Sequence, residues 1–241
     1  MSDKNYFKNI VESRNSLRSQ KISDELAERE VFTIFKLLRY FYNKIYDDQK
    51  NIVVDIGCGD KYLKKFFEKR NFDYIGYDLD DLDIEKDKIP LEDNSVDIII
   101  NIGLLEALQT YNNLFIEAKR VLKPDGFIYT ITPNWLKDYK NFYNNPIHKK
   151  PYTPNSLKQA YLINGFKEIN ILPGLRCKPI WYYKGALKFE KAFYFLAEGN
   201  RLRKKELKYY DYVQFLSDDA RWYEYSNCSL VTSIFTLQFM P

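Results

Sequence analysis

A glycine turn after a short apolar run is the first part of the sequence whose residue types suit ligand binding. Residues 52–56 are apolar apart from Asp55, and Gly57, Cys58 and Gly59 follow them directly. Glycine allows a sharp bend and a close approach of the backbone to a ligand. A helix opening behind the turn would add free N–H groups and a positive dipole end, which suit a carboxylate or phosphate. Because a purely structural turn can also carry GxG, the motif needs support from elsewhere in the chain.

An acidic residue at the end of the next apolar run supplies that support. Asp78 follows residues 74–77 and lies 21 residues after Gly57. In open α/β sheets this position faces the ligand crevice, where a carboxylate accepts hydrogen bonds from the hydroxyls of a ribose. The spacing therefore predicts a cofactor that contains a nucleoside, and a solvated strand-end aspartate is the plainer alternative.

The residues around the glycine turn separate two classes of nucleoside cofactor. Dinucleotide sites use GxGxxG, in which the third glycine permits close packing around a pyrophosphate. Tyr62 occupies that third position here, and a side chain of this size argues against a pyrophosphate. Asp55, two residues before Gly57, instead suits a ligand that carries an ammonium group. The pattern favours a cofactor with an amino group over a dinucleotide.

Metal and disulfide chemistry are not favoured. The stretch 78–97 holds nine acids and two lysines, but it lacks the central glycine and the distal glutamate of an EF-hand. Asp97, close to the start of an apolar run, is interpreted as structural rather than as a ligand. The three cysteines (Cys58, Cys177 and Cys228) form no CxxC, and the chain has one histidine. We therefore predict no metal site, no disulfide framework, and a reducing, cytoplasmic compartment.

The elements that must position these residues alternate along the chain. Short apolar runs at 52–56, 74–77, 96–100 and 127–131 predict strands, and the helical spacing of Leu63, Phe66 and Phe67 and of residues 104–121 predicts helices between them. Strands that alternate with helices imply a parallel sheet covered on both faces. A helix at 154–164 and strands at 166–172 and 228–239 follow, and residues 1–50 have helical spacing.

Composition excludes several classes of protein. The chain has 241 residues, a formal net charge of +4 and 17% aromatic residues. So many aromatics exclude disorder over most of the chain, and so small a charge excludes binding of duplex nucleic acid as the main task. The first residues lack the apolar core of a signal peptide, and the longest uncharged stretch, 225–241, is too polar to span a membrane.

Five motifs in order resemble those of the class I S-adenosylmethionine-dependent methyltransferases, of the methyltransferase type 11 group. They are the 55–59 turn, residues 89–99 (IPLEDNSVDII), 105–108 (LEAL), 120–126 (RVLKPDG) and 132–134 (TPN). The resemblance implies an α/β, Rossmann-like, doubly wound and mostly parallel seven-stranded sheet. We expect an N-terminal helical segment over 1–50 and a methyltransferase domain over 51–241, with a substrate-side helical insertion at about 176–225 before the last strand.

The resemblance also implies which residues bind S-adenosyl-L-methionine. Asp55, Gly57, Cys58 and Gly59 would line its methionine part, Asp78 and Leu79 the ribose, Asp83 and Ile84 the adenine, and Asn101, Ile102 and Gly103 the sulfonium and the substrate. Lys61 departs from the pattern, because the family often carries glycine or a small residue at that position. The path of the turn after Gly59 is therefore not fixed by the motif.

Three residues are candidates for a general base. His148, the single histidine, lies in the segment 146–153, which resembles a family segment near the substrate mouth. Histidine can accept a proton near neutral pH, and an equally weighted alternative is that His148 only anchors its loop. Glu106 and Tyr152 are weaker candidates. Some methyl transfers need little help from a base, because alignment with the sulfonium supplies much of the rate gain.

The acceptor is the least constrained part of the prediction. Residues 184–208 hold eight basic and three acidic residues, which suits an acidic substrate, a peripheral contact with an anionic membrane surface, or a lid helix with a solvated face. We predict O-methylation of a small molecule, a glycan or a sugar nucleotide, with the oligomeric state left open. The alternatives are a non-catalytic S-adenosylmethionine-binding regulator, or a methyltransferase acting on a lipid or quinone, an RNA or a protein. RNA and protein acceptors are disfavoured because Asn101-Ile102-Gly103-Leu104 is no NPPY-type motif.

Overall fold

A computed structural model describes residue 9 and residues 20–46, 50–175 and 232–239. The predicted insertion, the basic stretch 184–208, and Cys177 and Cys228 lie outside the described residues. The elements are α2 (Gln20–Tyr42), β1 (Asn51–Ile56), α3 (Lys64–Glu68), β2 (Phe72–Tyr77), β3 (Val96–Ile102), the 3-10 turn η1 (Leu105–Ala107), α4 (Asn112–Val121), β4 (Leu122–Pro133), α5 (Trp135–Asp138), the 3-10 turn η2 (Phe142–Asn144), α6 (Pro154–Ile163), β5 (Lys167–Leu175) and β6 (Thr232–Phe239).

The strands form one sheet in the order β2-β1-β3-β4-β6-β5. β2, β1, β3 and β4 pair in parallel, whereas β6 runs antiparallel to both of its neighbours. This arrangement confirms the Rossmann-like α/β prediction, but the described residues form six strands where seven were expected. Residues 78–95 form turns without a strand, because charged side chains interrupt every short apolar run there.

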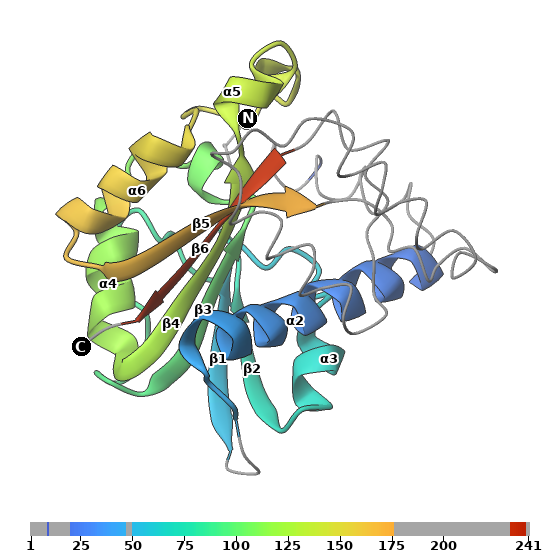
Figure 1. Cartoon of the computed structure of the whole chain (residues 1–241), viewed down its shortest axis with the longest axis vertical. Helices are drawn as coiled ribbons and strands as arrows, with labels where there is room; N and C mark the ends of the chain where they lie inside the picture. The colour runs from blue at the N-terminus through green and yellow to red at the C-terminus, as the bar shows by residue number, and fades with distance from the viewer. Residues whose placement is uncertain (1–8, 10–19, 47–49, 176–231, 240–241) are drawn as a thin grey trace.

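Each face of the sheet packs against its own helices (Figure 1). On one face, α2 and α3 cover alternate strand residues such as Ile98 and Ile100. On the other, α4 and α6 cover Ile99 and Ile128. Side chains alternate between the faces of a strand, so both faces of β3 are apolar and both need cover. In the part of the chain described, no helix is long and apolar enough to cross a membrane.

One predicted helix is divided in the structure. The helical spacing of 104–121 predicts a single helix, but the chain forms η1, then an irregular segment, and then α4 from Asn112. The break has a tertiary cause: the backbone carbonyl of Glu106 accepts hydrogen bonds from the N–H groups of Lys149 (2.7 Å) and Lys150 (3.0 Å). A carbonyl that accepts these two hydrogen bonds is not available to the N–H group four residues later, as a continuous α-helix requires. The divided helix turns Glu106 toward the carboxyl ends of the strands.

Asp97 has the structural role predicted for it. One of its carboxylate oxygens accepts a hydrogen bond from the backbone N–H of Ile52 at 2.8 Å, and Lys123 Nζ lies 2.8 Å from both oxygens. Residues 123–126 bulge out of β4: Val96 pairs with Leu122, and Ile98, only two residues later, pairs with Phe127. Asp97 therefore ties β1 and β4 together at the start of β3.

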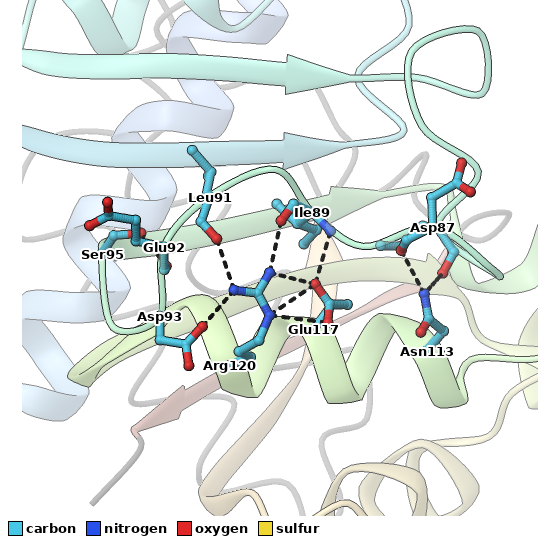
Figure 2. A network of polar contacts seen from close by, with 10 residues as sticks. Asp87, Ile89, Leu91, Glu92, Asp93, Ser95, Asn113, Glu117 and Arg120 are labelled. Carbon is cyan, nitrogen blue, oxygen red and sulfur yellow. Dashed lines mark hydrogen bonds and ion pairs between the residues drawn. The ribbon is translucent and has the colours of Figure 1, made fainter.

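An arginine on α4 holds the loop that leads into β3 (Figure 2). The guanidinium of Arg120 donates to Glu117 (2.6 Å), to Asp93 (2.7 Å) and to the backbone carbonyls of Ile89 and Leu91 (both 2.8 Å). Its hydrogen bonds are the main reason that the pKa of Glu117 is lowered. A surface pocket borders this network, on the side where β3 begins, and is lined by Lys88, Ile89, Pro90, Leu91, Glu92, Asp93 and Arg120.

We expect the Arg120→Ala variant to lose stability. The substitution leaves the largely buried Glu117 carboxylate without its cation and two carbonyls without their donor. Breaking such a network costs about 2–4 kcal/mol. Urea unfolding measures the difference, with Lys119→Ala on the exposed side of the same helix as the control. A loss below about 1 kcal/mol would mean that the network contributes no more than a surface ion pair.

Candidate functional site

The glycine turn joins the ends of β1 and β2. The backbone N–H groups of Gly57 and Cys58 both donate to the carbonyl of Tyr77, at 2.7 and 3.2 Å. Gly57 has φ of +76°, and a Cβ there would come within 3.1 Å of the Leu104 side chain. A larger residue at Gly57 would be strained in its backbone and crowded by Leu104. The turn is thus fixed at the edge where the parallel strands end.

Asp78 lies opposite this turn, as the spacing predicted. Gly59 has φ of +54°, and the nearest atom to a Cβ built on it is an oxygen of Asp78, 4.0 Å away. Apart from its two chain neighbours, no other described residue places an atom within that distance, so these residues leave the space between Gly59 and Asp78 open. The other Asp78 oxygen accepts a hydrogen bond from the backbone N–H of Leu79 at 2.7 Å, which orients the carboxylate. This opening suits a ribose at the end of β2.

Asp55 is an acid buried beneath the turn, with 2% of its surface exposed. The Tyr74 hydroxyl donates to it at 2.6 Å. Burial raises the pKa of Asp55 to about 7, against the lowering effect of the Tyr74 hydrogen bond, and the charges of Asp78 and Asp60 raise it further. A buried carboxylate surrounded by other acids is stabilised by a cation, so this position suits an ammonium group.

Cys58 packs its side chain inward, against Gly76. Its sulfur lies 2.9 Å from where a Cβ on Gly76 would stand, so glycine at 76 makes room for the thiol. Burial raises the pKa of Cys58 to about 12, and the charge of Asp55 adds to the effect. The thiolate is therefore disfavoured near neutral pH, and only the backbone of Cys58 faces the turn.

Asp83 and Ile84 lie in a tight turn of the acidic loop. The Asp83 carboxylate binds Lys86 Nζ at 2.8 Å. The backbone N–H of Asp83 donates to the side-chain carboxylate of Asp87, also at 2.8 Å. The Ile84 side chain, 4% exposed, packs into the core on the α4 and α6 face. Of these two predicted adenine contacts, Asp83 therefore keeps the more exposed side chain.

The end of β3 carries an unusual buried amide. The Asn101 side chain is fully buried, and neither its oxygen nor its nitrogen makes a hydrogen bond of normal geometry. It lies on the same face of the sheet as Thr130. Burial raises the pKa of the nearby Tyr161 hydroxyl, and its contacts with Thr130 and Asn101 offset part of that rise. A buried amide that lacks a hydrogen bond of normal geometry leaves room for a water or a ligand group beside it. Ile102 packs against the opposite face, and Gly103 bends the chain with φ of +72°.

Two of the candidate bases lie together beside Gly103. Glu106 is 2% exposed, and its Oε2 accepts a hydrogen bond from the Thr132 hydroxyl at 2.8 Å. Its Oε1 lies 3.8 Å from His148 Nε2 and 3.6 Å from the position of a Cβ on Gly103. The segments 101–106, 132–134 and 146–153 therefore converge at the carboxyl ends of β3 and β4.

The contacts of His148 define its tautomer. Nδ1 lies 2.7 Å from the carbonyl of Phe142, which can only accept, so Nδ1 carries the proton. Nε2 lies 2.8 Å from the amide nitrogen of Asn145 and accepts its hydrogen bond. The ring also packs against that of Phe142, with centroids 4.6 Å apart. These contacts favour the interpretation of His148 as an anchor of its loop.

Tyr152 is buried next to the same cluster. Its side chain is 3% exposed, and its hydroxyl makes no hydrogen bond of normal geometry. Burial raises its pKa, and the neighbouring Tyr111, Tyr161 and Glu106 raise it further. The phenolate is therefore disfavoured near neutral pH, and a general base must be deprotonated before it can accept a proton.

Two residues that orient these groups were not predicted from the sequence. Tyr74 and Thr132 hold the Asp55 and Glu106 carboxylates. Thr132 belongs to the 132–134 motif, so its position near a strand end was a signal that the sequence offered. The role of Tyr74 has no such signal, because it depends on the register of β1 on β2. The described residues hold no group of three or more His, Cys, Asp or Glu side chains able to bind a metal ion.

Comparison with known proteins identifies the family. A sheet with four parallel strands, a glycine turn after β1 and an acid after β2 define a nucleoside-binding α/β domain. A family model described as a methyltransferase domain matches residues 27–170, more than half of the chain, and the chain belongs to this family. The predicted class I S-adenosylmethionine-dependent methyltransferase is thereby confirmed, with its enzyme class and cofactor.

Solved structures share the fold at low sequence identity. A SAM-dependent methyltransferase from Archaeoglobus fulgidus is 18% identical, with a TM-score of 0.50 over 87% of this chain and 93% of that one. Phosphoethanolamine N-methyltransferase 2 from Haemonchus contortus, solved with phosphomonomethylethanolamine and S-adenosylhomocysteine, is 15% identical, with a TM-score of 0.50 over 87% of this chain and 52% of that one. No curated protein matches the sequence.

Proposed function

We propose that this methyltransferase transfers a methyl group to an oxygen atom of a small-molecule or glycan acceptor by direct in-line displacement. The observation that carries the proposal is the buried Glu106 carboxylate beside Gly103, at the edge where Asp78 faces the glycine turn. An oxygen acceptor must lose a proton when it is methylated, and a carboxylate held at this edge can take it. A basic acceptor nitrogen would make the same carboxylate an electrostatic anchor instead.

The residues of the edge divide the binding of the cofactor among them. Asp55 and the backbone of the 57–59 turn hold the amino acid end, where a buried acid meets the ammonium group. Asp78, with Leu79 orienting it, accepts the ribose hydroxyls. Asp83 lies at the adenine end, and the buried amide of Asn101 lies at the reacting end. When bound, S-adenosylmethionine supplies an electrophilic methyl group on a sulfonium.

Glu106 is the base in this proposal, and two neighbours position it. The Thr132 hydroxyl fixes Oε2, so Oε1 is the oxygen oriented toward Gly103 and His148. His148, neutral with its proton on Nδ1, keeps the loop 146–153 packed over Glu106. Both restraints pre-organise the carboxylate. The entropic cost of aligning it with the acceptor is therefore smaller, which lowers the activation free energy.

Binding and transfer assays separate the possible outcomes. Isothermal titration of the full chain with S-adenosylhomocysteine should show one-site binding. Radiolabelled methyl transfer is then measured against hydroxyl-bearing, amine-bearing and glycan acceptors. Binding with transfer to hydroxyl acceptors supports the proposal. Transfer confined to amines would overturn O-methylation, and binding without any transfer would favour a non-catalytic regulator.

The raised pKa of Asp55 predicts pH-dependent cofactor binding. The ionised form is the one that binds an ammonium, so affinity falls as pH drops through about 7, where Asp55 takes up its proton. Between pH 7.5 and 5.5 the dissociation constant of S-adenosylhomocysteine should rise about twentyfold, because its amino group stays protonated in this range. Titration at several pH values measures the change, and the Asp55→Asn variant should show a flat profile.

A matched ligand and the stability of the free protein check the assignment. 5′-Methylthioadenosine lacks the amino acid group, so its affinity should not follow the same pH dependence. The stability effect has the opposite sign: a carboxyl whose pKa is raised on folding stabilises the protein at low pH, and this contribution is lost as pH rises through 7. A pH dependence shared by both ligands would exclude Asp55 as its source.

A further inference from the structure

The turn 83–87 is held from outside by one side chain of α4 (Figure 2). The amide nitrogen of Asn113 donates to the backbone carbonyl of Ile84 at 2.9 Å and to that of Asp87 at 2.8 Å. Both hydrogens of the amide are used, and the two carbonyls belong to opposite ends of the same turn. One residue of α4 therefore binds both ends of the turn.

The neighbouring contacts make this turn rigid. The backbone N–H groups of Lys86 and Asp87 donate to the carbonyl of Asp83, at 2.9 and 2.7 Å, so the turn closes on itself. Glu85 accepts a hydrogen bond from the backbone N–H of Thr110, just before α4, at 2.8 Å. Ile84 also packs into the core, and among these contacts Asn113 is the one that binds the carbonyls at both ends of the turn. Arg120, two helical turns further on, holds only the later part of the loop.

We infer that Asn113 is a positioning residue that sets how well the site distinguishes adenine from other bases. The inference rests on the proposed function, in which Asp83 lies at the adenine end of the cofactor. Asn113 itself stays behind the turn, bound to its carbonyls, and acts through the placement of Asp83 and Ile84. Loss of its two hydrogen bonds would let the turn shift. A displaced turn would still contact the nucleobase but would no longer distinguish the hydrogen-bonding groups along the edge of adenine from those of another base.

The experiment compares two ligands that differ only in the base. S-Adenosylhomocysteine carries a 6-amino group, whereas S-inosylhomocysteine carries a 6-oxo group at the same position. Asn113→Asp keeps the shape of the side chain but removes both donors and places a charge against two carbonyl oxygens. We expect the variant to bind S-adenosylhomocysteine about tenfold more weakly, with little change for S-inosylhomocysteine. The preference for adenine should fall by the same factor.

Controls separate positioning from stability. Asn112→Ala, on the exposed neighbouring residue, should leave both affinities unchanged. Equal losses for both ligands in Asn113→Asp, or no loss for either, would overturn the inference, since a merely structural role cannot change the ratio of the two dissociation constants.

If Asn113→Asp does not fold, the same ratio is measured for Asn113→Ser, whose short side chain cannot reach both carbonyls. A wild-type chain that binds S-adenosylhomocysteine without preferring it to S-inosylhomocysteine also overturns the inference. A wild-type chain that binds neither ligand overturns the proposed function itself, on which the inference rests.

Discussion

The Asp78→Ala variant should bind S-adenosylhomocysteine about a hundredfold to a thousandfold more weakly than the wild type. The carboxylate faces the open space beside Gly59, and Leu79 orients it through a 2.7 Å hydrogen bond. Two hydroxyl donors lost from an ionised acceptor cost about 3–4 kcal/mol. The measurement is isothermal titration at pH 7.5, above the pKa of Asp55, so that the amino acid end of the site is intact.

Two further variants test whether the loss comes from the ribose contact. Asp80→Ala removes an exposed acid two residues away and should leave the affinity nearly unchanged. Asp78→Asn keeps one acceptor oxygen and should fall between the two alanine variants. Removing the charge of Asp78 should also lower the pKa of Asp55, because that charge helps to raise it. If Asp78→Ala and Asp80→Ala bind equally well, the ribose assignment is wrong.

The parts of the fold predicted from the sequence are those determined by short segments. The runs at 52–56, 74–77, 96–100 and 127–131 are apolar enough to be buried on both faces, and each lies within a strand of the parallel part of the sheet. Pro154 likewise predicted the start of a helix, and α6 begins there with Thr153 and Ser156 forming a capping box. These signals need no knowledge of distant contacts, because neighbouring residues carry them.

The parts that were not predicted depend on contacts between distant segments. Residues 104–121 have helical spacing, yet the N–H groups of Lys149 and Lys150 draw the Glu106 carbonyl out of the helix. The Tyr74 and Asp55 pair depends on the register of β2 against β1. Such pairings have no local signature, so the sequence could indicate that Glu106 and Asp55 matter but not what orients them.

The arrangement proposed to bind the cofactor was therefore more predictable than the arrangement proposed to act on the acceptor. Asp55, the glycine turn and Asp78 belong to two consecutive strand ends, and their spacing alone brings them together. Glu106, Thr132 and His148 come from three separate segments that meet only in the folded chain. A base assembled in this way cannot be chosen from composition, which is why the sequence ranked His148 above Glu106 and the geometry favours the reverse.

The Glu106→Gln variant tests that reversal. A glutamine has nearly the same shape and can still accept a hydrogen bond from Thr132, but it cannot take up a proton at neutral pH. With an oxygen acceptor identified by the transfer assay, kcat should fall about a hundredfold or more, the usual contribution of a general base. The dissociation constant of S-adenosylhomocysteine should stay within about threefold of the wild-type value, since Glu106 is assigned to the acceptor and not to the cofactor.

Variants of two neighbours of Glu106 separate the base from the residues that position it. Thr132→Val removes the donor that fixes Oε2 and should reduce kcat less than Glu106→Gln, because the base remains but is less well aligned. His148→Gln should act through the loop, raising KM more than it lowers kcat, if the ring serves only to anchor residues 142–148. If His148→Gln instead abolishes transfer while Glu106→Gln retains it, the histidine is the base. Its Nε2 lies 3.8 Å from Glu106 Oε1, so the carboxylate would then serve to stabilise the protonated ring.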